Sequence, residues 1–123
     1  MRESKFRGKH DGEWVYGNLV KTPYGLYIIP QNLISNSLPQ FSIDPKTVGQ
    51  FIGFTDKNGR EIYGRDLVED ENGIGEVEWV QEHCSYLVFT RNPSQYHRLE
   101  SDGQLSRTAV IGNAIDNPEL LEV

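Results

Sequence analysis

The chain has 123 residues, one cysteine and a formal net charge of −6, from 12 Lys and Arg residues against 18 Asp and Glu residues. This length suits one domain built around one hydrophobic core, and a single cysteine excludes an intrachain disulfide. The overall acidity argues against general coating of nucleic acid, because that binding needs a basic surface that releases counterions.

The first half of the chain reads as short strands joined by turns, because apolar residues recur with a period of two. Asp11 and Gly12 mark the first of these turns. Residues 31–46 are less regular and contain two prolines, with a third at position 30, so we expect a long loop there, with a loose β-arm or a short helix as alternatives. The strands are expected over residues 4–9, 14–20, 26–29 and 47–54.

The second half predicts a series of short antiparallel strands. Two copies of Asp-x-Asn-Gly, at residues 56–59 and 70–73, predict hairpin turns because Asn-Gly tolerates positive φ. Near the C-terminus, Pro118 suits the first position of a brief helical turn over residues 117–121, whose two leucines would cover the core. The strands are expected over residues 61–63, 66–69, 75–80, 86–90, 96–100 and 106–111.

These elements predict a mainly β fold class. We expect small antiparallel sheets, an SH3-like barrel-type C-terminal part and little helix. The chain is expected to be a single domain over residues 1–123, with two lobes at residues 1–46 and 47–123.

The acidic turns do not read as ligand loops. An EF-hand loop aligned on Asp70, Asn72 and Gly73 places Val68 and Trp79 at its first and last ligand positions, where oxygen ligands are needed. The chain also lacks the glycine motifs that bind phosphate groups. We therefore expect no metal and no cofactor.

No catalytic constellation is predicted. His83 and Cys84 adjoin in sequence, but neighbours on a strand point to opposite faces, and Glu82 disfavours a thiolate. A zinc site would have to gather these two residues with His10 and His97 from distant segments. Acidic strand residues leave a metal-dependent hydrolase as an alternative, with Glu76 and Asp66 as its test positions.

Charge is distributed unevenly along the chain. Residues 1–10 carry four basic residues and one acid, whereas residues 66–82 carry seven acids and no Lys or Arg. These segments are either solvated faces or a basic strand that meets an acidic face, within the chain or between copies. Tyr24, in a turn, is the aromatic residue we expect to be most exposed. The partner-binding candidates are Arg2, Lys5, Arg7, Tyr24, Arg65, Asp66, Glu76 and Glu78.

Several separated blocks of the sequence resemble one known family. Their order along the chain makes the likeness specific, although each block is short. The blocks are MRExKFRG at 1–8, WVYG at 14–17, TVGQF at 47–51, FIGFTDKNGREIYGRDLVE at 51–69, VIGN at 110–113 and DNPELL at 116–121. The chain resembles the YopX family of phage and prophage proteins.

The resemblance implies a β-rich, phage-encoded protein in a bacterial cytoplasm, and it supplies no catalytic residues. The chain departs from the family at one corner. Where the family reads Tyr-Glu-Gly-Asp, this sequence has Tyr63, Gly64, Arg65 and Asp66. The departure puts a shared ligand site at this corner in doubt and suggests a turn that rearranges while Asp66 stays.

The expected function is that of a non-enzymatic phage accessory protein. It would bind itself as a homo-oligomer and bind an unknown host or phage protein. A nucleic-acid-associated module that uses the basic N-terminus is the second reading. With no leader peptide and no apolar run of about 18 residues, we expect a cytoplasmic protein without membrane contact.

Overall fold

The computed structural model describes residues 5–30, 40–71, 73–91, 94–99 and 107–122. The chain divides into two compact units, Met1–Phe51 and Ile52–Val123, which we call unit 1 and unit 2. The sequence placed the boundary five residues earlier, between Lys46 and Thr47. The boundary lies at 51/52 because the first residues of β5 (Gly49–Thr55) still pair with β1 (Phe6–His10).

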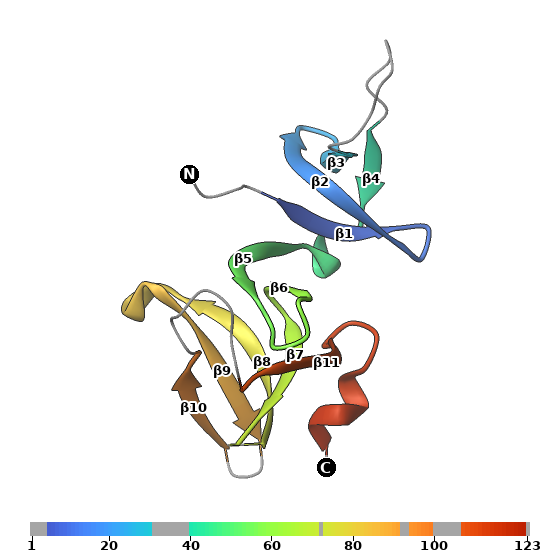
Figure 1. The fold of residues 1–123 in the computed structure, drawn as a ribbon. Helices are drawn as coiled ribbons and strands as arrows, with labels where there is room; N and C mark the ends of the chain where they lie inside the picture. Colours follow the sequence, from blue (N-terminus) through green and yellow to red (C-terminus); the bar gives the residue numbers. More distant parts are fainter. Residues whose placement is uncertain (1–4, 31–39, 72, 92–93, 100–106, 123) are drawn as a thin grey trace. The chain divides into compact units, whose positions relative to one another are not determined.

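Unit 1 is an antiparallel sheet in which β1 pairs with β5 on one side and β2 on the other, followed by β3 and β4 (Figure 1). A tight turn at Asp11 and Gly12, both with positive φ, reverses the chain between β1 and β2. Gly8 leaves room for Ile43 and Ile28, which are buried on the inner face. The remaining bounds are β2 Glu13–Thr22, β3 Gly25–Pro30, β4 Phe41–Ile43 and the 3-10 turn η1 Pro45–Thr47.

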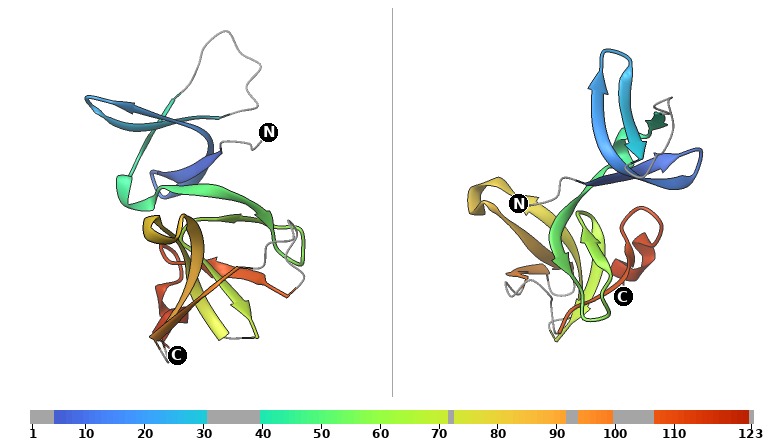
Figure 2. Two further views of the ribbon diagram at one scale, coloured as in Figure 1. Left: turned by 90° about the vertical axis from the view of Figure 1, so that its left-hand side faces the viewer. Right: turned by 45° about the horizontal axis from the view of Figure 1, so that its top comes forward.

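Unit 2 contains a five-stranded antiparallel sheet in the order β10-β9-β8-β7-β11. β8 and β9 run side by side as a long hairpin in both sets of ribbon views (Figures 1 and 2). β6 precedes this sheet in the chain and is the last strand in the order β4-β3-β2-β1-β5-β6. The bounds are β6 Glu61–Tyr63, β7 Asp66–Asp70, β8 Gly73–Val80, β9 Ser85–Arg91, β10 Ser94–Arg98 and β11 Ala109–Asn113, with 3-10 turns η2 Gln81–His83 and η3 Pro118–Glu122.

The unit 2 sheet packs against residues of β5 and β6 and against η3. Alternate residues of the strands form the main core, which also takes in two residues from β5 and β6. η3 contacts β8 and β9, and its Leu121 is buried, as the sequence predicted. The main core consists of Ile52, Ile62, Val68, Val77, Val88 and Val110.

The first Asp-x-Asn-Gly turn is built around a buried carboxylate. Asp56 is fully buried, and its Oδ1 accepts hydrogen bonds from the amides of Asn58 and Arg60 at 2.9 and 2.8 Å. Its Oδ2 accepts a bond from the Val110 amide of β11 at 2.8 Å. Asp56 therefore closes the turn and ties it to a strand more than fifty residues away in the chain.

The mainly β prediction is confirmed, with two antiparallel sheets and only 3-10 turns among the described helical segments. Hydrogen bonding between the described strands does not close a barrel. Only β6 has both expected bounds, and the other expected strands differ at one or both ends by one to three residues. The shift is largest for β10, which lies two residues earlier, and for β11, which begins three residues later and ends two residues later. In the irregular stretch, β4 and η1 lie in the described part, and residues 31–39 lie outside it.

Candidate functional site

The basic strand β1 directs its cations onto aromatic rings of its own unit. The Arg7 guanidinium carbon lies 4.6 Å from the Trp14 ring centroid, and the Lys9 ammonium lies 5.2 Å from the same centroid. The Lys5 ammonium lies 5.5 Å from the Phe51 ring. These distances are typical of cation–π contacts, so the predicted residues Lys5 and Arg7 stabilise unit 1. The predicted residue Arg2 lies outside the described residues.

Tyr24 lies at the tip of the β2–β3 hairpin. It is 90% exposed, as expected, and its backbone amide donates to Thr22 Oγ1 at 3.1 Å. Neither of the other unit 1 candidates, Lys5 and Arg7, belongs to this turn. Tyr24 is therefore a separate exposed ring rather than part of a cluster with them.

The turn between β6 and β7 brings Arg65 to Glu76. Arg65 Nε lies 3.3 Å from Glu76 Oε2, so two residues predicted as partner-binding candidates meet. The Arg65 backbone is held on both sides, since its amide donates to Val77 O at 2.7 Å and its carbonyl accepts from the Ala114 amide at 2.9 Å. Its φ of 73° lies in the left-handed region. This is the position at which the resembled family pattern has glycine.

Asp66 has a structural role in the same turn. It is 2% exposed, and its Oδ2 accepts a hydrogen bond from the Tyr63 amide at 2.8 Å. Because Asp66 precedes Leu67 on β7, whose partner across the ladder is Glu76, its side chain points to the face opposite Glu76. The structure therefore does not gather Asp66 with Glu76 and Glu78 as the hydrolase alternative requires.

Glu76 and Glu78 lie on one face of β8, two residues apart. Burial raises the pKa of Glu78, the neighbouring Glu76 raises it further, and Arg65 and Arg91 oppose the rise. Such a pair can share a proton or attract a cation. Among the described residues, no three His, Cys, Asp or Glu side chains are gathered as a metal site requires.

The side chains of His83 and Cys84, which adjoin in sequence, make different contacts. His83 ends η2, and its ring packs edge-on against the Tyr96 ring at 5.7 Å. Cys84 is exposed with a φ of 47°, and its thiol donates to Gln81 O at 3.4 Å. The other two histidines that were considered for zinc lie elsewhere, His10 against Ser42 and Asp11 and His97 against Asp70.

The β9–β10 hairpin carries a surface that the sequence reasoning missed. Tyr96 is 57% exposed and lies between the rings of His83 and Phe89, with centroid distances of 5.7 and 5.8 Å. Arg98 and Arg91 lie on the same face, because Arg98 is two residues from Tyr96 and Arg91 pairs with Ser94. We call Tyr96, Phe89, His83, Arg91 and Arg98 the hairpin surface.

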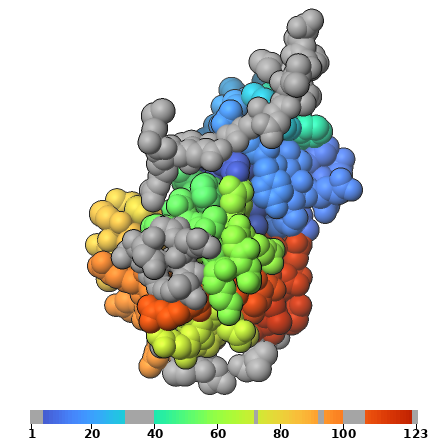
Figure 3. Space-filling view, viewed as in Figure 1, coloured from blue at the N-terminus to red at the C-terminus, as the bar shows by residue number. Residues whose placement is uncertain are grey.

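The local composition of the sequence could have indicated this surface. Residues 83–99 contain two arginines, two histidines and several aromatic residues but no Asp or Glu. The preceding residues 66–82 contain seven acids. In the space-filling view, the segments from η2 to β10, coloured gold to orange, adjoin one another on the surface of unit 2 (Figure 3).

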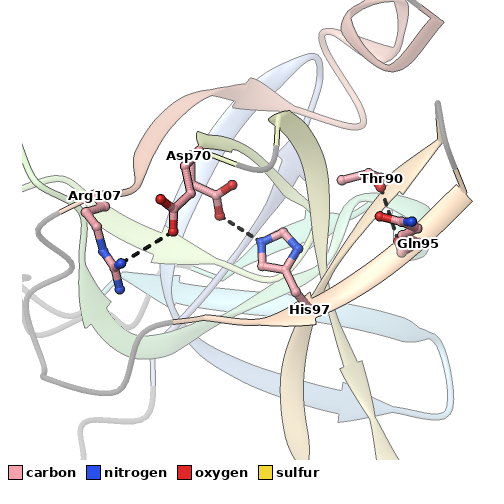
Figure 4. Close-up of polar contacts among 6 residues, drawn as sticks. Asp70, Thr90, Gln95, His97 and Arg107 are labelled. Carbon is pink, nitrogen blue, oxygen red and sulfur yellow. Dashed lines mark hydrogen bonds and ion pairs between the residues drawn. The ribbon is translucent and has the colours of Figure 1, made fainter.

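Polar contacts hold β10 in place. His97 Nε2 lies 2.7 Å from Asp70 Oδ2, and Thr90 Oγ1 donates to the Gln95 carbonyl at 3.3 Å (Figure 4). At the other side of the same view, Arg107 makes an exposed ion pair with Glu71 at 3.4 Å. The two contacts on β10 fix the strand that presents Tyr96.

The comparisons assign the chain to a family and not to an activity. No curated protein matches the sequence. Within the part of the chain that the structure describes, no helix has the length and apolar character needed to cross a membrane. A family model described as YopX protein matches residues 5–122, nearly the whole chain. The chain therefore belongs to the YopX family.

Proposed function

We propose that this chain is a non-enzymatic binding protein that acts through protein–protein contacts. The observation that carries the proposal is the hairpin surface. Its Tyr96 side chain is more than half exposed, is buttressed by two rings, and is flanked by two arginines. Tyrosine and arginine are enriched among the residues that contribute most to binding energy in protein interfaces.

The proposal also covers the oligomeric state of the protein and its cellular location. Unit 1 holds six basic and four acidic residues, and unit 2 holds six basic and fourteen acidic residues, so their net charges are +2 and −8. Opposite net charges favour contacts between the units of different copies, which supports a homo-oligomer. In this proposal the protein is a phage accessory protein of the bacterial cytoplasm with an SH3-like unit 2, and it binds a host or phage protein.

The test is an affinity pull-down from bacterial lysate with the tagged full chain, with and without nuclease, at low and high salt. We expect a protein partner that survives nuclease and is lost with Tyr96→Ser. Tyr24→Ser is the matched control, because Tyr24 is even more exposed but lies outside the hairpin surface. Equal capture by wild type and Tyr96→Ser would remove the hairpin surface from the proposal.

The homo-oligomer is tested separately by light scattering. Association that depends on opposite charges should weaken as salt increases, because exposed charges are screened beyond roughly 10 Å at 0.1 M salt. A fall in oligomer mass with salt supports the electrostatic part. A monomer at low salt contradicts the homo-oligomer.

The nucleic-acid module remains a second candidate because of one arrangement. Arg7 and Lys9 follow one face of β1 beside Trp14, and bases stack on aromatic rings flanked by cations. Both cations, however, already lie over the Trp14 ring. Binding of single-stranded DNA or RNA with a steep salt dependence would support this candidate, and no binding at low salt would exclude it. The metal-dependent hydrolase has no comparable observation in its favour.

A further inference from the structure

The two edge strands of the unit 2 sheet, β11 and β10, differ in whether their outward backbone groups have hydrogen-bond partners. At the β11 edge, the Val110 amide donates to Asp56 Oδ2 at 2.8 Å, and the Thr108 carbonyl accepts from the Lys57 amide at 2.9 Å. The Val110 carbonyl also accepts from the Arg60 guanidinium at 3.3 Å. The amide and carbonyl of Val110, and the carbonyl of Thr108 just before β11, therefore have partners from the β5–β6 turn, which hinders strand addition there.

The opposite edge is β10. In the part of the chain that the structure describes, β10 pairs with β9 alone, and four of its five residues are exposed. It contains no proline, and no bulge interrupts its register with β9. A strand of this kind offers a row of backbone donors and acceptors to another extended chain.

We propose that β10 binds an extended acidic segment of a partner protein, which adds to the sheet as a sixth strand. The proposal rests on the proposed function as a binding protein and names the partner's chemistry. Its backbone pairs with β10, and its acidic side chains pair with Arg98 and Arg91. One apolar side chain packs on Tyr96.

The charge of the hairpin surface selects the acidic partner. No hydrogen bond or ion pair links the side chain of Arg91 or Arg98 to another described residue, and no acid lies in residues 83–99. Glu76 and Glu78 of β8 share this face of the sheet, but β9 separates them from β10. The one charged neighbour assigned to Arg91 is Glu78, whose pKa it helps to lower against burial and Glu76. An acidic strand meets two arginines here, whereas a basic strand meets like charges, which are destabilising when directly opposite.

Strand geometry gives the partner a sequence pattern. An added strand lies about 4.8 Å from β10, and its alternate side chains share a face with Tyr96. Arg98 lies two residues beyond Tyr96, and Arg91 lies beside Ser94, two residues before it. The matching segment therefore has the pattern acid-x-apolar-x-acid.

A preformed strand reduces the ordering cost of binding. His97 fixes one end of β10 through Asp70, and Gln95 is held by Thr90 (Figure 4). The Tyr96 ring contacts two other rings, those of His83 and Phe89. Little conformational entropy of β10 is lost when a strand adds, which favours affinity.

Two other occupants fit less well. A second copy paired through its own β10 would bring together two hairpins that carry arginines and no acids. Single-stranded nucleic acid has no peptide N–H and C=O groups, so it cannot continue the backbone hydrogen-bond pattern of the sheet at β10. Both are outcomes of the experiment.

The experiment follows amide signals of the ¹⁵N-labelled full chain by NMR during titration with a blocked synthetic peptide, Glu-Thr-Val-Thr-Glu. We expect saturable shifts centred on the amides of residues 94–98 and none at Val110. The lysine analogue, Lys-Thr-Val-Thr-Lys, and the acidic peptide with N-methylated backbone amides are the probe controls. Both should bind at least about fivefold more weakly, as expected when one favourable contact is lost.

The matched variants are Arg98→Glu at β10 and Lys57→Glu at the capped edge. Arg98→Glu should weaken the acidic peptide at least about fivefold and improve the lysine peptide, whereas Lys57→Glu should change neither. A dispersed spectrum confirms that each variant is folded. Each inverts one basic residue of unit 2, so the change in net charge is the same.

Four results would overturn the proposal. These are no shift with the acidic peptide, equal binding of both peptides, larger shifts with oligo-dT, and shifts at residues 94–98 on dilution of the protein alone. The last two identify nucleic acid or a second copy as the occupant. A pull-down partner that is unaffected by Arg98→Glu leaves the proposed binding function standing while this inference fails.

Discussion

His97 and Asp70 are in hydrogen-bond contact although their strands are not neighbours. Nε2 of His97 on β10 lies 2.7 Å from Oδ2 of Asp70 on β7, and β9 and β8 lie between these strands in the sheet. Adjacent strands are about 4.8 Å apart, so three steps in a flat sheet span roughly 14 Å. The contact therefore requires that the sheet curl strongly between β7 and β10.

The first prediction concerns this contact. In a double-mutant cycle of Asp70→Asn and His97→Gln, we expect a coupling of about 1 kcal/mol in the free energy of unfolding, because both side chains are mostly buried. Urea unfolding of the four proteins measures it. The exposed pair Arg107 and Glu71 is the control and should show coupling close to zero. Equal coupling in both pairs would contradict the role of the His97–Asp70 contact in curling the sheet.

The second prediction concerns Asp56. Asp56→Ala leaves the amides of Asn58, Arg60 and Val110 without their acceptor, and one buried unsatisfied donor costs about 1–3 kcal/mol. We expect a loss of about 2–4 kcal/mol in unfolding free energy, measured by chemical denaturation. Glu119→Ala, at an exposed carboxylate on η3, is the control. A loss no larger than that of the control would show that Asp56 does not clamp the turn.

Asp56 also makes a prediction about pH. Burial by itself raises its pKa, but hydrogen bonds from the amides of Val110, Arg60 and Asn58, with the Arg60 charge, lower the pKa below its ordinary value of 3.8. A carboxyl whose pKa is lower in the folded state contributes stability that is fully present above its unfolded value and is lost as pH falls through the folded value. Unfolding free energy should therefore fall less steeply below about pH 4 in Asp56→Asn than in wild type. Parallel curves would refute this assignment.

The third prediction concerns Arg65. A left-handed conformation costs a residue other than glycine roughly 1–2 kcal/mol, and the half-exposed Arg65–Glu76 pair contributes less than about 1 kcal/mol. Arg65→Gly should hold or raise the melting temperature, and the β-branched Arg65→Val should lower it. Arg91→Gly, at an ordinary strand position, should lower the melting temperature. A lower melting temperature in Arg65→Gly than in Arg65→Val would contradict the strain.

The fourth prediction concerns Gly75 on β8. A Cβ at this position would lie 2.6 Å from Val88 Cγ1 and 2.8 Å from the Phe89 carbonyl oxygen. Since one of these neighbours is backbone, β8 and β9 must separate, and Gly75→Ala should cost about 1–3 kcal/mol of unfolding free energy. Gly12→Asn is the control, because Asn tolerates positive φ and nothing lies within 4 Å of a Cβ there. Equal losses would show that crowding at Gly75 is unimportant.

The strands and the first hairpin turn were predictable because their causes are local. Alternating apolar residues and Asn-Gly pairs act within a few residues, and β6 has the predicted bounds. The second Asp-x-Asn-Gly copy also joins two paired strands, with Asp70 opposite Gly73, although Asn72 lies outside the described residues. The unit boundary was misplaced because pairing of Gln50 with Phe6 is a long-range event that local pattern does not encode.

The sequence predicted the relative positions of candidate residues only where those residues lie on the same strand. Glu76 and Glu78 share a face of β8, as the alternation of a strand predicts, whereas Asp66 points to the opposite face. The meeting of Arg65 with Glu76 depends on a positive φ at Arg65, which propensity rules assign to glycine. The hairpin surface depends on strand register across β9 and β10, which places Tyr96 opposite Phe89.

The turn at Asp56 also controls the rate at which Asn58 deamidates. An Asn followed by Gly deamidates readily, because the glycine nitrogen can attack the Asn side chain and close a succinimide ring. In the folded chain the Gly59 nitrogen donates to the Asp56 carbonyl at 3.0 Å, and the Asn58 amide is held by Asp56 Oδ1. The ring cannot close while these bonds persist, so isoaspartate at position 58 accumulates only in molecules that have opened. The fraction of isoaspartate at position 58 therefore measures how often this turn unfolds during storage.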